Sequence, residues 1–418
     1  MGGYAAYMTL GFLLLSLPVM QTGPIAGIDN LFIAVSAVST TGLVTVDPGT
    51  SYRLAGEIVI LLLIQVGGLG YMTVSSFLVL SIRQKLSRGR ERTVRAAFEL
   101  PEDMDVKTFL RTVIVFCVGL ELAGAAALYP MFTAAGEEEP LWSAIFHAIS
   151  AFCTAGFSLN ANSLEDYRGH VGVNVVVSVL SLAGAIGFLV VADSWRAMTG
   201  DDRRLGATSK VILRTTLAII FVAFLLILFT DEAVRALPPT EQVLSAFFQA
   251  MTASTTVGFN TFPIGGLAMS SVVVLMLLMI VGASPAGTGG GLKTTTFAAL
   301  WALVGATLQR SPTVVSFGRE LPQRTVNTAS ATLVYYCGLL LAAMVLLTNF
   351  EPGQPLNVLV FEAMSALGTV GLSLGVTGSL SDAGKAVIIV LMVAGRVGIL
   401  TFALALALPR RGAAPTAG

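Results

Sequence analysis

Charged side chains are scarce in this chain. Aspartate, glutamate, lysine and arginine together make up 11% of its 418 residues, against roughly 25% in an average soluble domain. Hydrophobic residues make up 55%, and the mean hydropathy is +0.83. This composition excludes an ordinary soluble domain and predicts a protein embedded in a lipid bilayer. The formal net charge is zero, and no nucleic-acid partner is expected.

Cysteine and histidine are also rare, which limits the chemistry that the chain can perform. Cys117, Cys153 and Cys337 lie in apolar stretches and predict neither a disulfide framework nor a metal site. His147 and His170 lack the spacing of paired ligands, and we interpret both as structural. No carboxylate pair or nucleophile–base set falls in the apolar stretches. The chain is therefore not predicted to be an enzyme, and no covalent cofactor is expected.

Eight apolar runs are long enough to cross about 30 Å of hydrocarbon, which takes about 20 helical residues. They lie at 4–21, 56–81, 108–132, 171–195, 211–229, 268–308, 327–348 and 385–408. The first run is predicted to be a spanning helix and not a removed signal, because no convincing small-residue cleavage site follows it. The eight runs form four successive pairs. Between the two runs of each pair lies a shorter, semi-apolar stretch, at 29–39, 141–153, 242–255 and 356–368. These stretches are too short to span and predict re-entrant half-helices enclosed in protein.

Each half-helix is followed by the same motif, a threonine, one further residue, a glycine and an apolar residue. The four copies are Thr40-Thr41-Gly42-Leu43, Thr154-Ala155-Gly156-Phe157, Thr256-Val257-Gly258-Phe259 and Thr369-Val370-Gly371-Leu372. Their near-equal spacing predicts a fourfold internal repeat. Glycine lets the backbone aim successive carbonyl oxygens at one axis, as in potassium-channel filters, where carbonyls replace the hydration shell of the ion. We therefore predict that these sixteen residues bind potassium ions.

The predicted fold is an all-α integral membrane protein with eight transmembrane helices. Its four tandem helix–pore-loop–helix repeats surround one ion pore with pseudo-fourfold symmetry. The repeats comprise residues 1–81, 108–198, 211–308, in which the second helix is broken, and 326–408. Cytoplasmic connections are predicted at 82–107, 196–210 and 309–325, because basic residues gather there and cytoplasmic loops carry such an excess. Both termini are then cytoplasmic, and the filters face outward below acidic loops that concentrate cations.

The sixth apolar run is interrupted by a stretch that cannot form a straight helix, because it is rich in glycine and contains a proline. Irregular backbone at membrane depth is tolerated only where it is enclosed in protein or lines a watery cavity. We predict a gate below the filter, formed within residues 282–296 by Gly282, Ser284, Pro285, Gly287, Thr288, Gly289, Gly290, Gly291 and Lys293. A phosphate-binding loop is disfavoured, because Leu292 stands where that motif needs glycine and no strand precedes it.

Three ionisable side chains lie within the predicted spans and are functional candidates for that reason: Glu121, Lys293 and Arg396. Two interpretations of Arg396 remain open. In one, its fork of donors pairs with backbone carbonyls or a carboxylate and holds helices together. In the other, it projects into the cavity below the filter and opposes a passing cation.

With these motifs the whole chain resembles the Trk/Ktr/HKT superfamily of potassium transporters, and within it the Ktr-type membrane subunit. The resemblance rests on the four Thr-x-Gly motifs, on Gly67-Gly68-Leu69-Gly70, on the 284–296 stretch and on Gly395-Arg396-Val397-Gly398. It implies a gate formed by the 282–296 segment together with Arg396. It also implies a homodimer in the membrane and a cytosolic nucleotide-binding regulatory ring of the KtrA/TrkA type.

The predicted function is channel-like potassium uptake across the cytoplasmic membrane of a prokaryote. Potassium occupies the filter, and sodium is left open as an activator. The alternatives are an alternating-access cation carrier and a potassium/sodium symporter of the same superfamily. Four filter loops that face the same way disfavour a carrier, because rocking halves need a site that both sides reach.

Overall fold

The computed structural model describes residues 2–70, 106–199, 205–285, 287–398 and 402, and these residues are mostly helical. The end of the second predicted span, nearly all of the connection 82–107 and most of the chain after Gly398 lie outside the described residues. Three described helices are long and apolar enough to cross a membrane: Phe109–Ala135, Thr208–Thr230 and Gln323–Phe350. They belong to α7 (Val106–Ala135), α11 (Ala207–Thr230) and α16 (Gln323–Phe350), while α1 (Gly2–Leu15) occupies the first predicted span.

Four short helices occupy the stretches that were predicted to be half-helices. They are α2 (Gly27–Ser39), α8 (Pro140–Phe152), α13 (Pro239–Thr255) and α17 (Leu356–Gly368). The C-terminal part of each is buried, and each leads into one Thr-x-Gly motif. Proline stands at the start of α8 and α13, where its missing N–H is not needed by the helix.

The second helices of the predicted pairs are shorter than expected, because glycines interrupt them. They are α4 (Leu54–Leu69), α9 (Val171–Ile186), α14 (Met269–Ile280) and α18 (Asp382–Val397). Over the described residues, the apolar runs at 56–81, 171–195 and 385–408 are not single helices: α4, α9 and α18 end at Gly70, Gly187 and Gly398, with φ of +78°, +91° and +93°. Such angles end a helix and strain any residue with a Cβ.

Two of these helices are followed by a second described helix. After Gly187 the chain continues as α10 (Phe188–Thr199), so the predicted fourth span consists of two helices. The predicted break in the sixth span is confirmed, because irregular backbone separates α14 from α15 (Thr294–Leu308).

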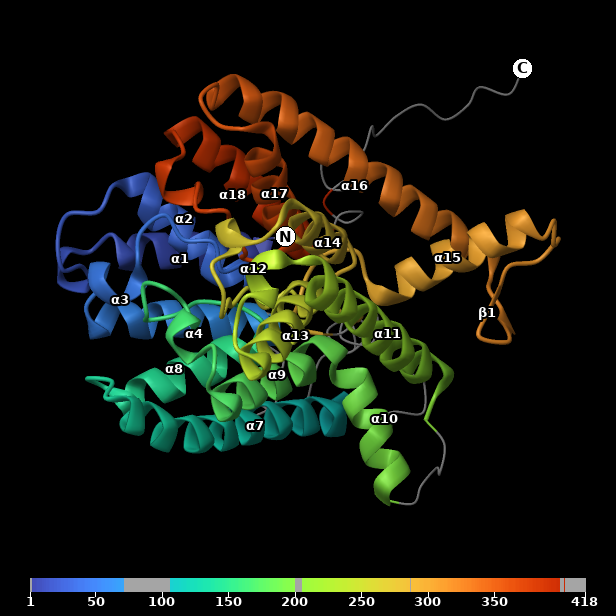
Figure 1. Cartoon of the computed structure of the whole chain (residues 1–418), viewed down its shortest axis with the longest axis horizontal. Helices are drawn as coiled ribbons and strands as arrows, with labels where there is room; N and C mark the ends of the chain where they lie inside the picture. The colour runs from blue at the N-terminus through green and yellow to red at the C-terminus, as the bar shows by residue number, and fades with distance from the viewer. Residues whose placement is uncertain (1, 71–105, 200–204, 286, 399–401, 403–418) are drawn as a thin grey trace.

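The helices are arranged in a ring (Figure 1). The segments α1–α4, α7–α9, α11–α14 and α16–α18 occupy successive sectors around the centre of the view, in colours from blue through green to red. Each second helix packs on the short helix of the next segment, with α4 on α8, α9 on α13 and α14 on α17. Packing of α18 on α2 closes the ring.

Polar contacts follow the same order along one end of these helices. Lys385 of α18 forms an ion pair with Asp29 of α2, with 2.7 Å between Nζ and Oδ1. Two further contacts link the first segment to the second and the second to the third: Trp142 Nε1 donates to Glu57 Oε2 at 2.5 Å, and Arg168 Nε donates to Glu241 Oε2 at 2.9 Å. Each contact joins the first turn of a second helix, or in the case of Arg168 the residues just before it, to the beginning of the next short helix.

The predicted connection 309–325 holds the described strands, which the all-α expectation did not include. The strands β1 (Val315–Ser316) and β2 (Arg319–Glu320) pair antiparallel across a turn at Phe317 and Gly318, both with positive φ. Short helical turns complete the described elements: η1 (Pro18–Met20), α3 (Pro48–Ser51), η2 (Glu165–Tyr167), α12 (Glu232–Arg235), η3 (Ile264–Gly266) and η4 (Thr377–Ser379).

Candidate ion-binding site

The four Thr-x-Gly motifs adopt one backbone conformation. The first threonine of each follows its short helix in the left-handed region, with φ of +52° at Thr40, +50° at Thr154, +58° at Thr256 and +50° at Thr369. This conformation is uncommon for residues other than glycine. The next amide then bonds to the carbonyl five residues earlier, as Ala155 N does to Ser150 O at 2.8 Å. Equivalent bonds at Thr41, Val257 and Val370 measure 2.9, 3.1 and 2.8 Å.

The glycine of each motif abuts the next loop in the ring. A Cβ added to it would lie closer than 3.0 Å to a backbone carbonyl oxygen, a distance that real Cβ atoms essentially never show. The four encounters are Gly42 with Ala155, Gly156 with Val257, Gly258 with Val370 and Gly371 with Thr41. All four glycines also have positive φ, between +66° and +91°. Only glycine fits these positions, and the cyclic order shows that the four loops enclose one axis.

A hydroxyl residue six positions before each glycine supports its loop, and our reading of the sequence missed this set. Ser36 Oγ accepts from the Gly42 amide at 3.1 Å, and Ser365 Oγ accepts from the Gly371 amide at 3.1 Å. In the other two loops the hydroxyl donates to the carbonyl after the glycine, from Ser150 to Phe157 at 2.8 Å and from Thr252 to Phe259 at 2.7 Å. The fixed offset from the four glycines was a signal that could have identified these residues.

Buried polar side chains also tie the chain after the glycine to the short helices. His147 lies in α8, and its Nε2 is 2.9 Å from Ser158 Oγ. Glu362 of α17 accepts a hydrogen bond from Ser373 Oγ at 2.9 Å. The contact with Ser158 gives His147 a structural role, because it holds the chain after Gly156 against α8.

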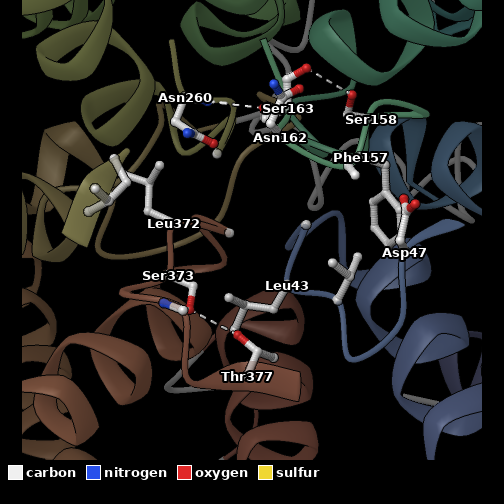
Figure 2. A pocket seen from close by; sticks show the side chains of 18 of the residues that line it. Leu43, Asp47, Phe157, Ser158, Asn162, Ser163, Asn260, Leu372, Ser373 and Thr377 are labelled. Carbon is white, nitrogen blue, oxygen red and sulfur yellow. Dashed lines mark hydrogen bonds between the residues drawn. The ribbon is translucent and has the colours of Figure 1, made fainter. Parts of the chain in front are cut away.

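One side of the ring opens into a cavity of about 450 Å³ (Figure 2). The four glycines line it together with Leu43, Phe157, Asn260 and Leu372. Figure 2 shows Leu43, Phe157 and Leu372 around this opening, with Asp47 at its edge. The carboxylate of Glu165 also lines the cavity and accepts a hydrogen bond from Asn260 Nδ2 at 2.7 Å. Burial raises the pKa of the Glu165 carboxyl above its ordinary value.

The 282–296 segment folds back on itself between α14 and α15. Gly282 N donates to Leu292 O at 2.8 Å, and Ala283 N donates to Gly290 O at 3.1 Å. Lys293 anchors the segment internally, since its Nζ donates to Gly289 O at 2.8 Å. These bonds close a narrow loop. The part of it that includes Thr288, Gly289 and Gly290 projects toward the four Thr-x-Gly motifs.

The projecting residues cross the base of the ring, on the side formed by the first threonines. Thr288 contacts two of them, because its Oγ1 lies 3.0 Å from Thr154 Oγ1 and its carbonyl accepts from Thr40 Oγ1 at 3.3 Å. The neighbouring glycines lie against the other two: an added Cβ would collide with the hydroxyl of Thr256 from Gly289, and with that of Thr369 from Gly290. Three of the residues predicted to form the gate, Thr288, Gly289 and Gly290, therefore lie directly against the four loops.

Arg396 of α18 reaches the same place from another direction. Its Nη1 donates to Thr40 Oγ1 at 2.9 Å and to the Thr288 carbonyl, while its Nη2 donates to the Gly67 carbonyl. The geometry combines the two interpretations left open by the sequence, since the side chain pairs with backbone carbonyls and also lies at the base of the ring. A guanidinium fork suits this task because it holds several donors in fixed directions.

Glu121, the remaining ionisable candidate, is not part of the ring. Its carboxylate accepts from Gln65 Nε2 at 3.0 and 3.2 Å and is buried between α4 and α7. Cys153 Sγ lies 3.9 Å from the same carboxylate. Glu121 thus lies behind the second Thr-x-Gly loop, next to the helix whose end Arg396 contacts.

Comparisons with known proteins agree with this geometry. The model of the family described as "TrkH: Cation transport protein" matches residues 13–412. The Ktr system potassium uptake protein B of Bacillus subtilis (strain 168) is 35% identical over 97% of this chain and 91% of its own. The potassium/sodium uptake protein NtpJ of Enterococcus hirae is 33% identical, over 97% of this chain and 91% of its own.

One solved structure shows the same fold. The crystal structure of the potassium transporter TrkH from Vibrio parahaemolyticus is similar to this chain with a TM-score of 0.75 at 22% sequence identity. The similarity covers 97% of this chain and 83% of that one.

Proposed function

This chain belongs to the TrkH family of cation transport proteins, and from that membership we propose that it carries out channel-like potassium uptake. The observation that carries the proposal is the closed ring in which each glycine abuts the carbonyl of the next loop. A ring of carbonyls replaces the hydration shell of potassium without a fixed negative side chain. The names of the relatives, which include two potassium uptake proteins and a potassium/sodium uptake protein, support this cation.

The proposed architecture is four repeats with pseudo-fourfold symmetry and eight membrane-spanning helices. The repeats are residues 1–81, 108–198, 211–308 and 326–408, joined by cytoplasmic connections at 82–107, 196–210 and 309–325. The cyclic packing of α4 on α8, α9 on α13, α14 on α17 and α18 on α2 supports this division. Family members are membrane proteins, and we place this one in the cytoplasmic membrane of a prokaryote with both termini inside.

The 282–296 segment and Arg396 form the proposed gate. Thr288, Gly289 and Gly290 lie across the base of the ring, so a potassium ion leaving the filter meets them first. The guanidinium adds a positive charge at the same level. A flow of ions then requires that the segment move aside and that Arg396 release the Thr288 carbonyl.

Two partners complete the proposal, a second copy of the chain in the membrane and a cytosolic nucleotide-binding ring of the KtrA/TrkA type. Both come from the family resemblance and from the names of the relatives as components of Ktr systems. Sodium as an activator, and coupled potassium/sodium transport, form the second candidate function, which the name of the Enterococcus hirae relative favours.

Ion flux into proteoliposomes tests the proposed function. Purified chain is reconstituted, and uptake of potassium, sodium and caesium is compared under equal gradients. The proposal requires potassium uptake that exceeds sodium uptake and that continues without a sodium gradient. Potassium uptake that needs an inward sodium gradient would identify a coupled carrier instead.

A further inference from the structure

The first half of the 282–296 segment is attached to α9, a helix of another predicted repeat. Ser284 N donates to the Ala185 carbonyl at 3.0 Å, and Thr288 N donates to the Gly184 carbonyl at 3.1 Å. Gly287 lies so close to the same place that an added Cβ would be 2.6 Å from the Ala185 oxygen. Two backbone hydrogen bonds and a glycine contact thus hold the projecting part of the segment.

These two carbonyls are available because α9 ends early. In a continuous helix each carbonyl bonds to the amide four residues later, so the carbonyls of Gly184 and Ala185 would be used by residues 188 and 189. The break at Gly187, with φ of +91°, leaves the carbonyls of the last turn without intrahelical partners. The 282–296 segment supplies the missing donors.

A side-chain contact joins the end of α8 to this junction. Thr288 Oγ1 donates to the Phe152 carbonyl at 3.2 Å, and the same oxygen lies 3.0 Å from Thr154 Oγ1. Gly184 fills the remaining space, since an added Cβ there would meet both the Phe152 carbonyl and Thr288 Oγ1. Ser284, Thr288 and Gly184 are all buried. Three segments therefore meet within van der Waals contact immediately beside the second Thr-x-Gly loop.

Beyond the break, α10 links the junction to the next long helix. Asp193 of α10 accepts hydrogen bonds from the Gly206 amide at 3.1 Å and from Ser209 Oγ at 2.6 Å, at the start of α11. Figure 1 shows α10 projecting away from the centre of the ring beside α11. Asp193 thus couples α10 to the start of α11, on the far side of the break at Gly187.

We propose that the Gly184 and Ala185 carbonyls form a latch that keeps the gate closed, with Gly187 as its hinge. The inference rests on the proposed gating function and says what controls the gate: a helix of repeat 2, α9, holds the gate segment, which belongs to repeat 3. Straightening α9 into α10 would return the two carbonyls to the helix and release Ser284 and Thr288. A force applied to α10 from the cytoplasmic side is then transmitted to the base of the filter.

The substitution Gly287→Ala tests the latch, because its Cβ would push the segment away from the Ala185 carbonyl. The matched control is Gly266→Ala, where an added Cβ meets only side-chain atoms at 3.5 Å or more. We expect Gly287→Ala to raise basal potassium flux about tenfold, the effect of weakening two backbone hydrogen bonds. Hydrogen exchange should show loss of protection at the Ser284 and Thr288 amides in this variant and not in the control.

The outcomes separate the latch from the gate. Unchanged flux and unchanged amide protection in folded Gly287→Ala would overturn the latch. Deletion of residues 286–291 then decides whether the gate survives: raised flux in the deletion keeps the gate and removes only the latch, whereas unchanged flux in both removes the proposed gate itself. If Gly287→Ala does not assemble, exchange in the unaltered protein still decides, because fast exchange at Ser284 and Thr288 would contradict the latch.

Discussion

Arg396 donates a hydrogen bond of 2.9 Å to the hydroxyl of Thr40, although 356 residues separate them. The same guanidinium bonds to the carbonyls of Thr288 and Gly67. One side chain from the last helix therefore joins the first Thr-x-Gly loop, the end of α4 and the segment that crosses the base of the ring. Loss of this side chain would remove the hydrogen bonds that hold these three parts together.

Replacement of Arg396 by alanine should raise potassium flux. It removes a positive charge that, at 4 Å and an effective dielectric constant of 20, opposes a potassium ion by about 4 kcal/mol, and it also frees the Thr288 carbonyl. Arg396→Lys keeps the charge and should change flux less. Flux assays on both variants, with exposed Arg235→Ala as control, check this. Loss of expression and thermal stability in both variants would instead assign Arg396 a purely structural role.

The substitution Gly258→Ser should reduce the preference for potassium over sodium. Its Cβ would collide with the Val370 carbonyl, and φ of +85° disfavours any side chain. The displaced carbonyl no longer fits a dehydrated potassium ion, so we expect the selectivity ratio to fall about tenfold, equivalent to about 1.4 kcal/mol. Gly266→Ser, where an added Cβ comes no closer than 3.5 Å to a neighbouring atom, is the matched control. A folded Gly258→Ser protein with parental selectivity would contradict the filter assignment.

Deletion of residues 286–291 should raise potassium flux while the protein still assembles. The segment removed includes Thr288, Gly289 and Gly290, which lie against the four threonines at the base of the ring. Size-exclusion chromatography verifies assembly, and flux into proteoliposomes measures the effect. Flux at or below the parental level in an assembled protein would count against a gate at this position.

Potassium uptake should fall when the external pH is lowered, in part through Glu165. Burial raises the pKa of this carboxyl, so it gains its proton at a higher pH than an exposed glutamate, whose pKa is about 4.3. Protonation removes one negative charge from the mouth of the cavity and lowers the local cation concentration. Uptake at low potassium concentration, measured between external pH 7 and 5, should fall less in Glu165→Gln. Identical pH profiles for the two proteins would exclude this contribution.

Much of the ring was predictable because its geometry depends on backbone and on glycine. A Thr-x-Gly motif needs the same φ angles and the same close approach wherever it occurs, so Gly42 and its three equivalents could be recognised by residue type alone. The short helices before them were also predicted, since their length excludes a membrane crossing. The mostly helical character of the chain was predicted from its long apolar runs.

The parts that could not be predicted depend on partners distant in the sequence. The carbonyl of Gly67 offers no residue-type signal that it accepts from Arg396. Continuous apolar residues around Gly187 and Gly398 favoured unbroken spans, because one glycine within a helix costs only about 1 kcal/mol. The break at Gly187 becomes understandable from the ring itself, in which the carbonyls of Gly184 and Ala185 accept hydrogen bonds from the 282–296 segment.

Anomalous scattering from thallium, a potassium analogue, in crystals of the unaltered protein tests the central claim most directly. If the four loops bind potassium through their backbone, thallium peaks will lie on the axis enclosed by the carbonyls of Thr41, Ala155, Val257 and Val370. The peaks should be lost from this level in Gly258→Ser. An empty axis with thallium at the carboxylates of Asp47 and Glu165 instead would contradict the claim that a ring of backbone carbonyls selects the ion.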